Sequence, residues 1–157
     1  MRLEVRLAGQ GDVEQLSYLI SRLKSLNEEL DPQFKTVNNL FEVVQDYVKR
    51  SVGSDRAFIL IAQNGESGEI AGIVRVELED RVFYVPRIVA VISDVYVKPK
   101  YRRKRVATLL LERAKEEAKR RGAGMLVAVY PANNMIAENF YSKAGFKLLQ
   151  VEKYVLL

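Results

Sequence analysis

The chain has 157 residues; 48% are hydrophobic, 29% are charged, and 25 lysines and arginines against 20 acidic residues give a net charge of +5. This length and balance exclude a disordered chain and predict one globular domain, residues 1–157, with a sizeable core. The absence of cysteine and histidine excludes thiol nucleophiles, thiolate metal sites and imidazole bases, which leaves proton transfer to carboxylates, tyrosines or water.

The first third of the chain predicts a strand, two helices and a second strand. Leu3 to Leu7 alternate as a short strand, and Asp12 is a candidate N-cap for the helix that follows. The apolar residues of that helix recur at helical spacing and are Leu16, Leu19, Ile20, Leu23 and Leu26. A second helix is expected from about Val37 to Arg50, then a buried strand from Ala57 to Ala62 and a turn that starts at Asn64-Gly65.

The rest of the chain predicts more strands of the same sheet and two further helices. The expected elements are strands at Ile70–Leu78 and Ile88–Val97, a helix from about Arg103 to Arg121 that Gly122 ends, a strand at Met125–Tyr130, a short helix at Asn133–Ala144, and a terminal strand or hairpin at Phe146–Leu157. A strand, a helix and a strand in succession predict a parallel pair. The long strands before them predict antiparallel neighbours, so the sheet should be mixed.

Residues 95–111 form the most informative stretch of the chain. A β-branched and aromatic strand leads to Pro99, then to a burst of cations, and then to a helix with an apolar stripe. Helix N-termini and flanking cations together favour anions. Eleven lysines and arginines lie between Lys98 and Arg121 against three glutamates, and the remainder of the chain is net acidic. Such a focal cluster favours a compact phosphate-bearing ligand over a nucleic acid, which would need a broad basic face.

Two motifs in this order resemble those of the GNAT superfamily of N-acyltransferases. The first is Val97-x-Pro99-x-Tyr101-Arg102 with the basic loop and Leu-rich helix after it; the second runs from Asn134 through Ala137, Phe140, Tyr141 and Ala144 to Gly145 and Phe146. The resemblance covers nearly the whole chain. It implies an α/β (α+β) fold: a central mixed, mostly antiparallel twisted sheet with a parallel splayed pair in the middle and helices on both faces.

The resemblance further implies acetyl-CoA as co-substrate and no metal. The loop from Arg102 through Ala107 would surround the pyrophosphate, and the strand edge would pair with the pantetheine arm like an added strand. The residues that it implies for coenzyme A binding are Val95, Tyr96, Val97, Arg102, Arg103, Lys104, Arg105, Val106, Ala107, Thr108 and Asn134. The competing interpretation is a basic, solvated helix start beside an ordinary core strand.

One departure from the family pattern concerns the phosphate loop. The family usually has glycine where this chain has Arg105, and often glycine where it has Arg103. Glycine permits a close approach of the backbone to phosphate. Because helical φ angles do not require glycine, we expect Arg105 to be sterically tolerated. Our hypothesis is that Arg103, Lys104 and Arg105 add a salt-sensitive attraction to phosphate that offsets looser amide contacts.

The resemblance implies direct attack of a neutral amine on the thioester, with a backbone amide near Val95–Val97 facing the oxyanion. Tyr141 matches the family tyrosine that protonates the departing thiolate, although it could simply pack the last helix on the sheet. Asp94 is the candidate base or amine anchor; it could equally be a structural carboxylate. Glu77 and Glu79 are lesser candidates, and a water chain needs no single base.

The acceptor is expected to be a primary amine: a small amine, a polyamine or a protein amino group. Residues 27–32 carry three carboxylates that would attract a cation, or they form a solvated acidic loop. Only eleven residues follow Phe146, so the cleft should be open to a protein substrate or completed by another subunit in a homodimer.

Two alternatives belong to other functional classes: an acyl-CoA-binding module without catalysis, and a small nucleic-acid binder, which the confined basic cluster disfavours. The N-terminus lacks the apolar run of a signal peptide and no stretch approaches transmembrane length, which predicts a cytoplasmic protein without membrane contact. The abundance of Lys, Arg and Glu hints at a thermophilic source.

Overall fold

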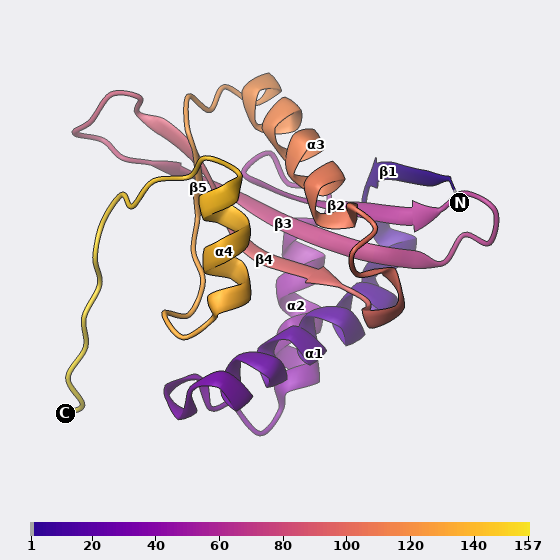
Figure 1. Cartoon of the computed structure of the whole chain (residues 1–157), viewed down its shortest axis with the longest axis horizontal. Helices are drawn as coiled ribbons and strands as arrows, with labels where there is room; N and C mark the ends of the chain where they lie inside the picture. The colour runs from indigo at the N-terminus through magenta and orange to yellow at the C-terminus, as the bar shows by residue number, and fades with distance from the viewer. Residues whose placement is uncertain (1) are drawn as a thin grey trace.

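The computed structural model describes residues 2–157 and contains a five-stranded twisted sheet with strand order β1-β2-β3-β4-β5 (Figure 1). Its strands are β1 (Leu3–Leu7), β2 (Ala57–Asn64), β3 (Ile70–Asp80), β4 (Ile88–Val97) and β5 (Leu126–Ala128). Neighbouring strands are antiparallel except β4 and β5, which are parallel. The expectation of a mixed, mostly antiparallel sheet with one parallel pair is therefore confirmed.

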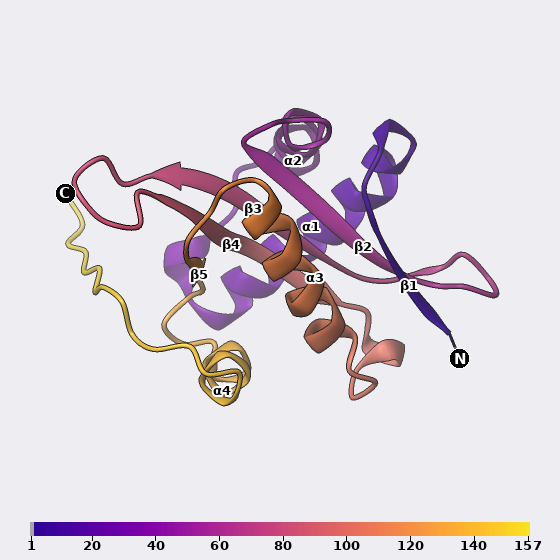
Figure 2. The same ribbon diagram turned by 90° about the horizontal axis from the view of Figure 1, so that it is seen from above.

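Helices cover both faces of this sheet, as expected (Figure 2). One face carries α1 (Val13–Leu30) and α2 (Leu40–Ser51), and the other carries α3 (Val106–Arg120) and α4 (Met135–Lys143). Three single-turn 3-10 helices complete the regular structure: η1 (Gln10–Asp12), η2 (Pro32–Phe34) and η3 (Pro99–Tyr101). None of the helices within residues 2–157 combines the length and the apolar character needed to cross a bilayer.

The central strands are apolar on both sides because both sides are covered. In β2 and β3 the burial is nearly continuous, whereas an alternating pattern would mark a sheet with one wet face. Two separate cores result. One joins the sheet to α3 and α4 through residues such as Leu110 and Tyr141, and the other joins it to α1 and α2 through residues such as Leu16 and Val48.

The parallel pair is short, and the two strands separate early. β5 contacts β4 only from Ala90 to Ile92, and the last backbone bond between them runs from the Val129 N–H to the Ile92 carbonyl at 3.1 Å. The register of β3 and β4 also shifts here, because Arg75 faces Asp94 and Val76 faces Ile92. Ser93 is thus the extra residue of a β-bulge. Past the bulge, β4 continues to Val97 without β5 beside it.

Several predicted boundaries need correction. α2 begins at Leu40 instead of Val37, after a turn at Asn38-Asn39, and β5 has three residues instead of six. Asp12 does occupy the N-cap of α1, but its carboxylate makes no capping bond there. It accepts from the Gly9 N–H and from Arg6 at 2.8 Å, because that ion pair holds it outside the helix.

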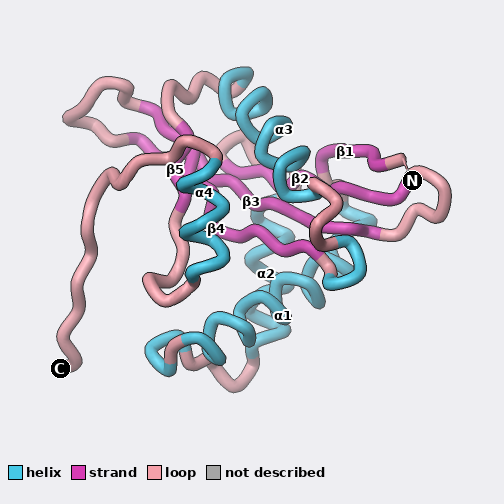
Figure 3. The backbone as a smooth tube through the Cα atoms, in the orientation of Figure 1, coloured by secondary structure: helices cyan, strands magenta, loops and turns pink. Residues whose placement is uncertain are grey.

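The predicted terminal strand is absent from residues 146–157. This segment is an extended tail without regular structure (Figure 3). Phe146 packs on the core, and the large apolar side chains after it face solvent. The physical reason is that a strand needs a neighbour, and no strand of the described chain lies beside the tail.

Candidate functional site

A small apolar cavity lies where α3 and α4 pack on β3 and β4, and Tyr141 is the one polar residue in its wall. The cavity measures about 10 Å³, roughly the space of one water molecule. Its walls come from the sheet, α3 and α4, and include Val95, Ala107, Leu110, Phe140 and Tyr141. Three residues expected at the site, Val95, Ala107 and Tyr141, are therefore brought together although they are far apart in the sequence.

Tyr141 sits in an aromatic cluster at this cavity and is only 6% exposed. Its ring stacks on Tyr130 with centroids 5.4 Å apart and meets the edges of Phe140 and Phe146 at 5.1 and 5.0 Å. Within residues 2–157 its hydroxyl has no hydrogen-bond partner. Burial raises the pKa of Tyr141 far above its ordinary value, because the phenolate would be desolvated. The phenol therefore stays protonated.

The start of α3 offers unoccupied backbone donors. The first helical hydrogen bond runs from the Leu109 N–H to the Arg105 carbonyl at 3.0 Å. The N–H groups of Val106, Ala107 and Thr108 therefore have no carbonyl partner within the helix. No side chain caps this helix. Arg102 lies at the loop's entrance, where its Nε donates to the Val97 carbonyl at 3.2 Å. Amides and guanidinium groups thus converge at one helix N-terminus, an arrangement that suits phosphate.

Arg103 and Arg105 both adopt the left-handed backbone conformation, each with a φ of 63°. The expectation that Arg105 would have a helical φ is wrong, because the chain turns into α3 through a left-handed N-cap. These are conformations that glycine adopts freely and side chains adopt at a cost of about 1 kcal/mol. The two positions where the family prefers glycine are thus the two positions where this loop needs a positive φ.

We expect Arg105→Gly to raise the free energy of unfolding by about 0.5–1 kcal/mol, or Tm by about 2–4 °C, because it relieves the strain of the left-handed residue. Arg105→Ala is the matched control, since it removes the same charge but keeps the Cβ. Thermal unfolding followed by circular dichroism measures both. Equal shifts for glycine and alanine would show that charge, and not backbone strain, sets the effect.

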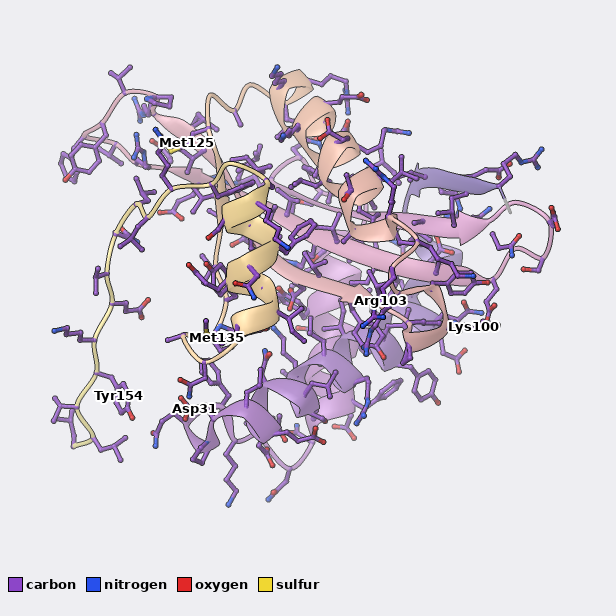
Figure 4. The ribbon with its side chains drawn as sticks, in the orientation of Figure 1. Asp31, Lys100, Arg103, Met125, Met135 and Tyr154 are labelled. Atoms are coloured by element: carbon purple, nitrogen blue, oxygen red, sulfur yellow. The ribbon has the colours of Figure 1, made fainter. Side chains whose placement is uncertain are left out.

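The cations of the loop divide into two groups. Glu69, in the β2–β3 turn, accepts from Tyr101 Oη at 2.6 Å and pairs with Lys100 at 2.7 Å and Lys98 at 3.7 Å. The bonds from Lys100 and Tyr101 lower the pKa of Glu69 to about 2. Within residues 2–157, residues 102–105 have no acidic partner and remain exposed. Figure 4 places Lys100 and Arg103 on this loop. Sequence reasoning missed Glu69, which only the fold brings here.

Asp94 lies on the opposite face of the sheet, under α1 and α2. Its side chain is fully buried and accepts from Lys24 Nζ at 2.5 Å, Tyr47 Oη at 2.6 Å and Ser93 Oγ at 3.0 Å. The bulge turns Ser93 to the same side, where it also accepts from Arg75 at 3.0 Å. Asp94 and Tyr141 therefore do not share a cavity.

Lys24 and Tyr47 were not recognised as partners of Asp94 from the sequence. Tyr47 belongs to the apolar stripe of α2, and Lys24 follows Leu23 in α1 as an ordinary surface lysine would. A weak signal exists in Arg75, a charged residue in the apolar first half of β3. In the structure its guanidinium stacks 4.0 Å from the centroid of the Tyr47 ring. Of the lesser candidates, Glu77 pairs with Arg75 at 2.9 Å and Glu79 is exposed in β3.

The acidic loop after α1 meets the start of α4. Asn133 Nδ2 donates to Asp31 Oδ2 at 3.3 Å, and Asn134 caps α4 by accepting from the Ala137 N–H at 3.0 Å. Asp31 also caps η2, and Glu28 accepts from the Thr36 N–H at 2.6 Å. Part of the loop's charge is thus used to hold the loop itself. The described residues contain no cluster of acidic side chains that could hold a metal ion.

Comparisons with known proteins agree with this geometry. A family model described as "Acetyltransferase (GNAT) family" matches residues 23–146. Among solved structures, AAC(6')-Iy in complex with a bisubstrate analogue is 17% identical, with a TM-score of 0.76 over 100% of this chain and 99% of that one. A predicted acetyltransferase from Clostridium acetobutylicum, with acetyl-CoA, is 19% identical, with a TM-score of 0.77 over 99% and 96%.

A third solved structure is an aminoglycoside acetyltransferase from an uncultured soil metagenomic sample. It is 24% identical and has a TM-score of 0.70 over 100% of this chain and 99% of that one. At these identities the likeness is one of fold. Among curated proteins, no sequence matches the chain.

Proposed function

Because the chain belongs to the acetyltransferase (GNAT) family, we propose that it transfers an acetyl group from acetyl-CoA to a primary amine by direct attack in a ternary complex. One observation carries the proposal. Tyr141 is buried, stays protonated at neutral pH and lines the cavity where α3 and α4 pack on β3 and β4, beside Val95. A proton donor is needed there, since the thioester's leaving group departs as a thiolate.

The fit of coenzyme A follows from three features on one side of the sheet. The amides of Val106 to Thr108, with the guanidinium groups of residues 102–105, would hold the pyrophosphate. The edge of β4 from Val95 to Val97, which β5 leaves uncovered, would pair with the amides of the pantetheine arm. The thioester would then lie near Tyr141. Asn134 would contribute through its amide, whose oxygen already caps α4.

The reaction needs no covalent enzyme intermediate. The nitrogen lone pair of the neutral amine attacks the thioester carbon, and a backbone amide of β4 faces the oxyanion. The C–N bond forms and the carbonyl π electrons move to oxygen. The carbonyl then re-forms as the C–S bond breaks, and the leaving sulfur takes the proton of Tyr141. The new ammonium gives its proton to water, and the phenolate regains one from solvent. The chain thus supplies orientation and one proton donor.

We propose a structural role for Asp94 and a water path for the amine proton. Asp94 has no free face, because Lys24, Tyr47 and Ser93 surround its two oxygens. Its side chain also lies on the other face of the sheet from the Tyr141 cavity, which supports the same assignment. The acceptor amine would instead approach past the Asp31 loop and the start of α4, which a hydrogen bond joins.

A second function is favoured by one specific observation. Arg103 and Arg105 place Cβ atoms where a phosphate loop with glycine would have none. A loop crowded in this way could bind acyl-CoA in a less productive position, which would suit a non-catalytic sensor. The retention of Tyr141 and Asn134 argues for the enzyme, because a sensor has no need of the residues that would act on the leaving group.

The test combines binding with turnover. Acetyl-CoA should bind in calorimetry, with an affinity that falls several-fold as salt rises from about 50 to about 300 mM, because residues 102–105 are exposed cations. Release of free CoA thiol should then exceed hydrolysis with at least one of a diamine, a lysine peptide, a peptide N-terminus or an aminoglycoside. Binding without release would favour the sensor, and absence of binding would contradict both functions.

A further inference from the structure

Residues 69–72, at the start of β3, contact the basic loop or its ends at three points. The basic loop, residues 98–105, links β4 to α3 and carries six lysines and arginines. The contacts come from the Glu69 side chain, the Ala71 carbonyl and the bare backbone of Gly72. The Lys98 N–H donates to the Ala71 carbonyl at 2.9 Å, at the point where β4 ends and the loop begins (Figure 1). The loop therefore starts its course against β3.

Gly72 packs against the two residues that flank the basic loop. A Cβ atom at Gly72 would lie 3.2 Å from Val97 Cγ2 and 3.0 Å from Val106 Cγ1, which is closer than most such contacts. Val97 is the last residue of β4, and Val106 is the first residue of α3. The missing side chain of Gly72 thus lets both ends of the loop meet on β3. The part that these contacts leave unsupported is the stretch between the two ends.

Glu69 supports that stretch through a buried tyrosine. Tyr101 is only 5% exposed, and its ring belongs to the same core as Val106. The Tyr101 hydroxyl donates to Glu69 Oε1 at 2.6 Å. Arg102 follows directly, and from there to the start of α3 no side chain caps the helix. The bond between Tyr101 and Glu69 is therefore the side-chain link through which β3 sets the position of the loop before its phosphate-binding amides.

The same carboxylate pairs with two of the six cations of the loop. Its Oε1 lies 2.7 Å from Lys100 Nζ, and its Oε2 lies 3.7 Å from Lys98 Nζ. The side chains of Glu69 and Lys100 are 35% and 65% exposed, so these ion pairs contribute little to the stability of the fold. Their effect is local instead, because they fix where two positive charges lie beside the candidate phosphate site.

We infer that Glu69 is a positioning residue for coenzyme A: it holds Tyr101, and through Tyr101 the amides of residues 106–108, where the pyrophosphate needs them. The inference rests on the proposed binding of acetyl-CoA, but not on turnover, so it applies to an enzyme and to a sensor alike. It assigns a role in the site to a residue outside both sequence motifs. The competing role for Glu69 is that of a simple negative charge, which would weaken phosphate binding by repulsion.

Two substitutions of Glu69 separate these roles, because both remove the charge and only one removes the hydrogen-bond acceptor. In calorimetry at about 300 mM salt, where charge effects are screened, Glu69→Ala should raise the Kd of acetyl-CoA about tenfold. Glu69→Gln keeps an amide oxygen that can accept from Tyr101, so its Kd should stay within about threefold of the natural value. Tyr101→Phe keeps every charge and loses the same bond, and it should weaken binding by about threefold or more. The losses of Glu69→Ala and Tyr101→Phe should not add in the double variant.

Glu66→Ala is the matched control, since Glu66 is exposed in the same turn and makes no ion pair within residues 2–157. Its Kd should change less than about twofold at this salt concentration, measured well below the Tm of each variant. With an amine that is turned over, Glu69→Ala should raise the KM of acetyl-CoA as it raises the Kd and leave kcat within about twofold. Equal Kd values for Glu69→Ala and Glu69→Gln, or natural binding by Tyr101→Phe, would overturn the inference alone. A natural chain that does not bind acetyl-CoA would overturn the proposed function with it.

Discussion

Tyr141→Phe is expected to lower kcat by about 100-fold or more while the Kd of acetyl-CoA changes less than about twofold, because it removes a proton donor and keeps the ring. The ring's contacts with Tyr130, Phe140 and Phe146 do not involve the hydroxyl. The hydroxyl has no partner within residues 2–157, so its loss leaves no orphaned group in the fold. Stability should therefore be preserved, and the defect should lie in turnover.

The pH dependence gives an independent readout of the same residue. Burial raises the pKa of Tyr141, so the phenol remains protonated as pH rises through the neutral and mildly alkaline range. Turnover should increase with pH as the acceptor amine loses its proton, and it should show no fall from loss of the Tyr141 proton below about pH 10. An alkaline fall near neutrality would show that a different acid acts.

The measurement is steady-state release of free CoA thiol, with calorimetry for the Kd. Tyr18→Phe is the control, since Tyr18 lies on α1 with 60% of its surface exposed and far from the cavity. Should Tyr141→Phe turn over at the natural rate, the residue only packs α4 on the sheet. The competing interpretation given by the sequence would then be correct.

Much of the fold could be predicted from the sequence, because the pattern of neighbouring residues determines where several strands and helices begin and end. β1 and β4 have the predicted bounds, since β-branched and apolar runs end at residues that cannot extend them, such as Pro99 after β4. The predicted start of α3, at Arg103, is three residues too early, because the backbone conformation of the preceding loop cannot be read from its residue types. Arg103 and Arg105 look like helix formers, yet the loop holds both in the left-handed conformation.

The residues of the candidate site also fall into two groups, those that the sequence predicts and those that only the fold brings together. Tyr141 and the loop of residues 102–105 could be found because each belongs to a contiguous motif. The partners of Asp94 could not, because Lys24 lies 70 positions and Tyr47 lies 47 positions away in the chain and only the packing of α1 and α2 brings them to β4. Glu69 reaches the basic loop before α3 in the same manner. The prediction of a terminal strand at residues 146–157 is wrong, because an alternating pattern does not form a strand without a neighbour, and no strand among residues 2–157 lies beside the tail.

Asp94→Asn is expected to lower the free energy of unfolding by about 2–3 kcal/mol, because it leaves Lys24 without its counter-charge at a fully buried position. Removing one member of a buried pair can cost more, but the Lys24 side chain is 33% exposed and water relieves part of the loss. The new amide also turns donors toward Tyr47 and Ser93, which both donate to Asp94 now. Tm should fall by about 5–10 °C.

Asp46→Asn is the matched control for charge, since Asp46 pairs with Arg50 at 3.0 Å on the surface of α2 with 67% of its side chain exposed. Such a pair contributes less than about 1 kcal/mol, so Tm should barely move. Lys24→Met with and without Asp94→Asn completes a double-mutant cycle, and the two losses should not add, because the residues share one interaction.

Activity measured well below the lowered Tm decides between the two roles of Asp94. A structural carboxylate predicts a kcat within about threefold of the natural chain, since the Tyr141 cavity lies on the other face of the sheet. A general base predicts a fall of about 100-fold or more at that temperature. An Asp94→Asn chain with unchanged Tm and lost turnover would therefore show that Asp94 acts as the general base. The acceptor amine would then have to reach the face of the sheet that α1 and α2 cover.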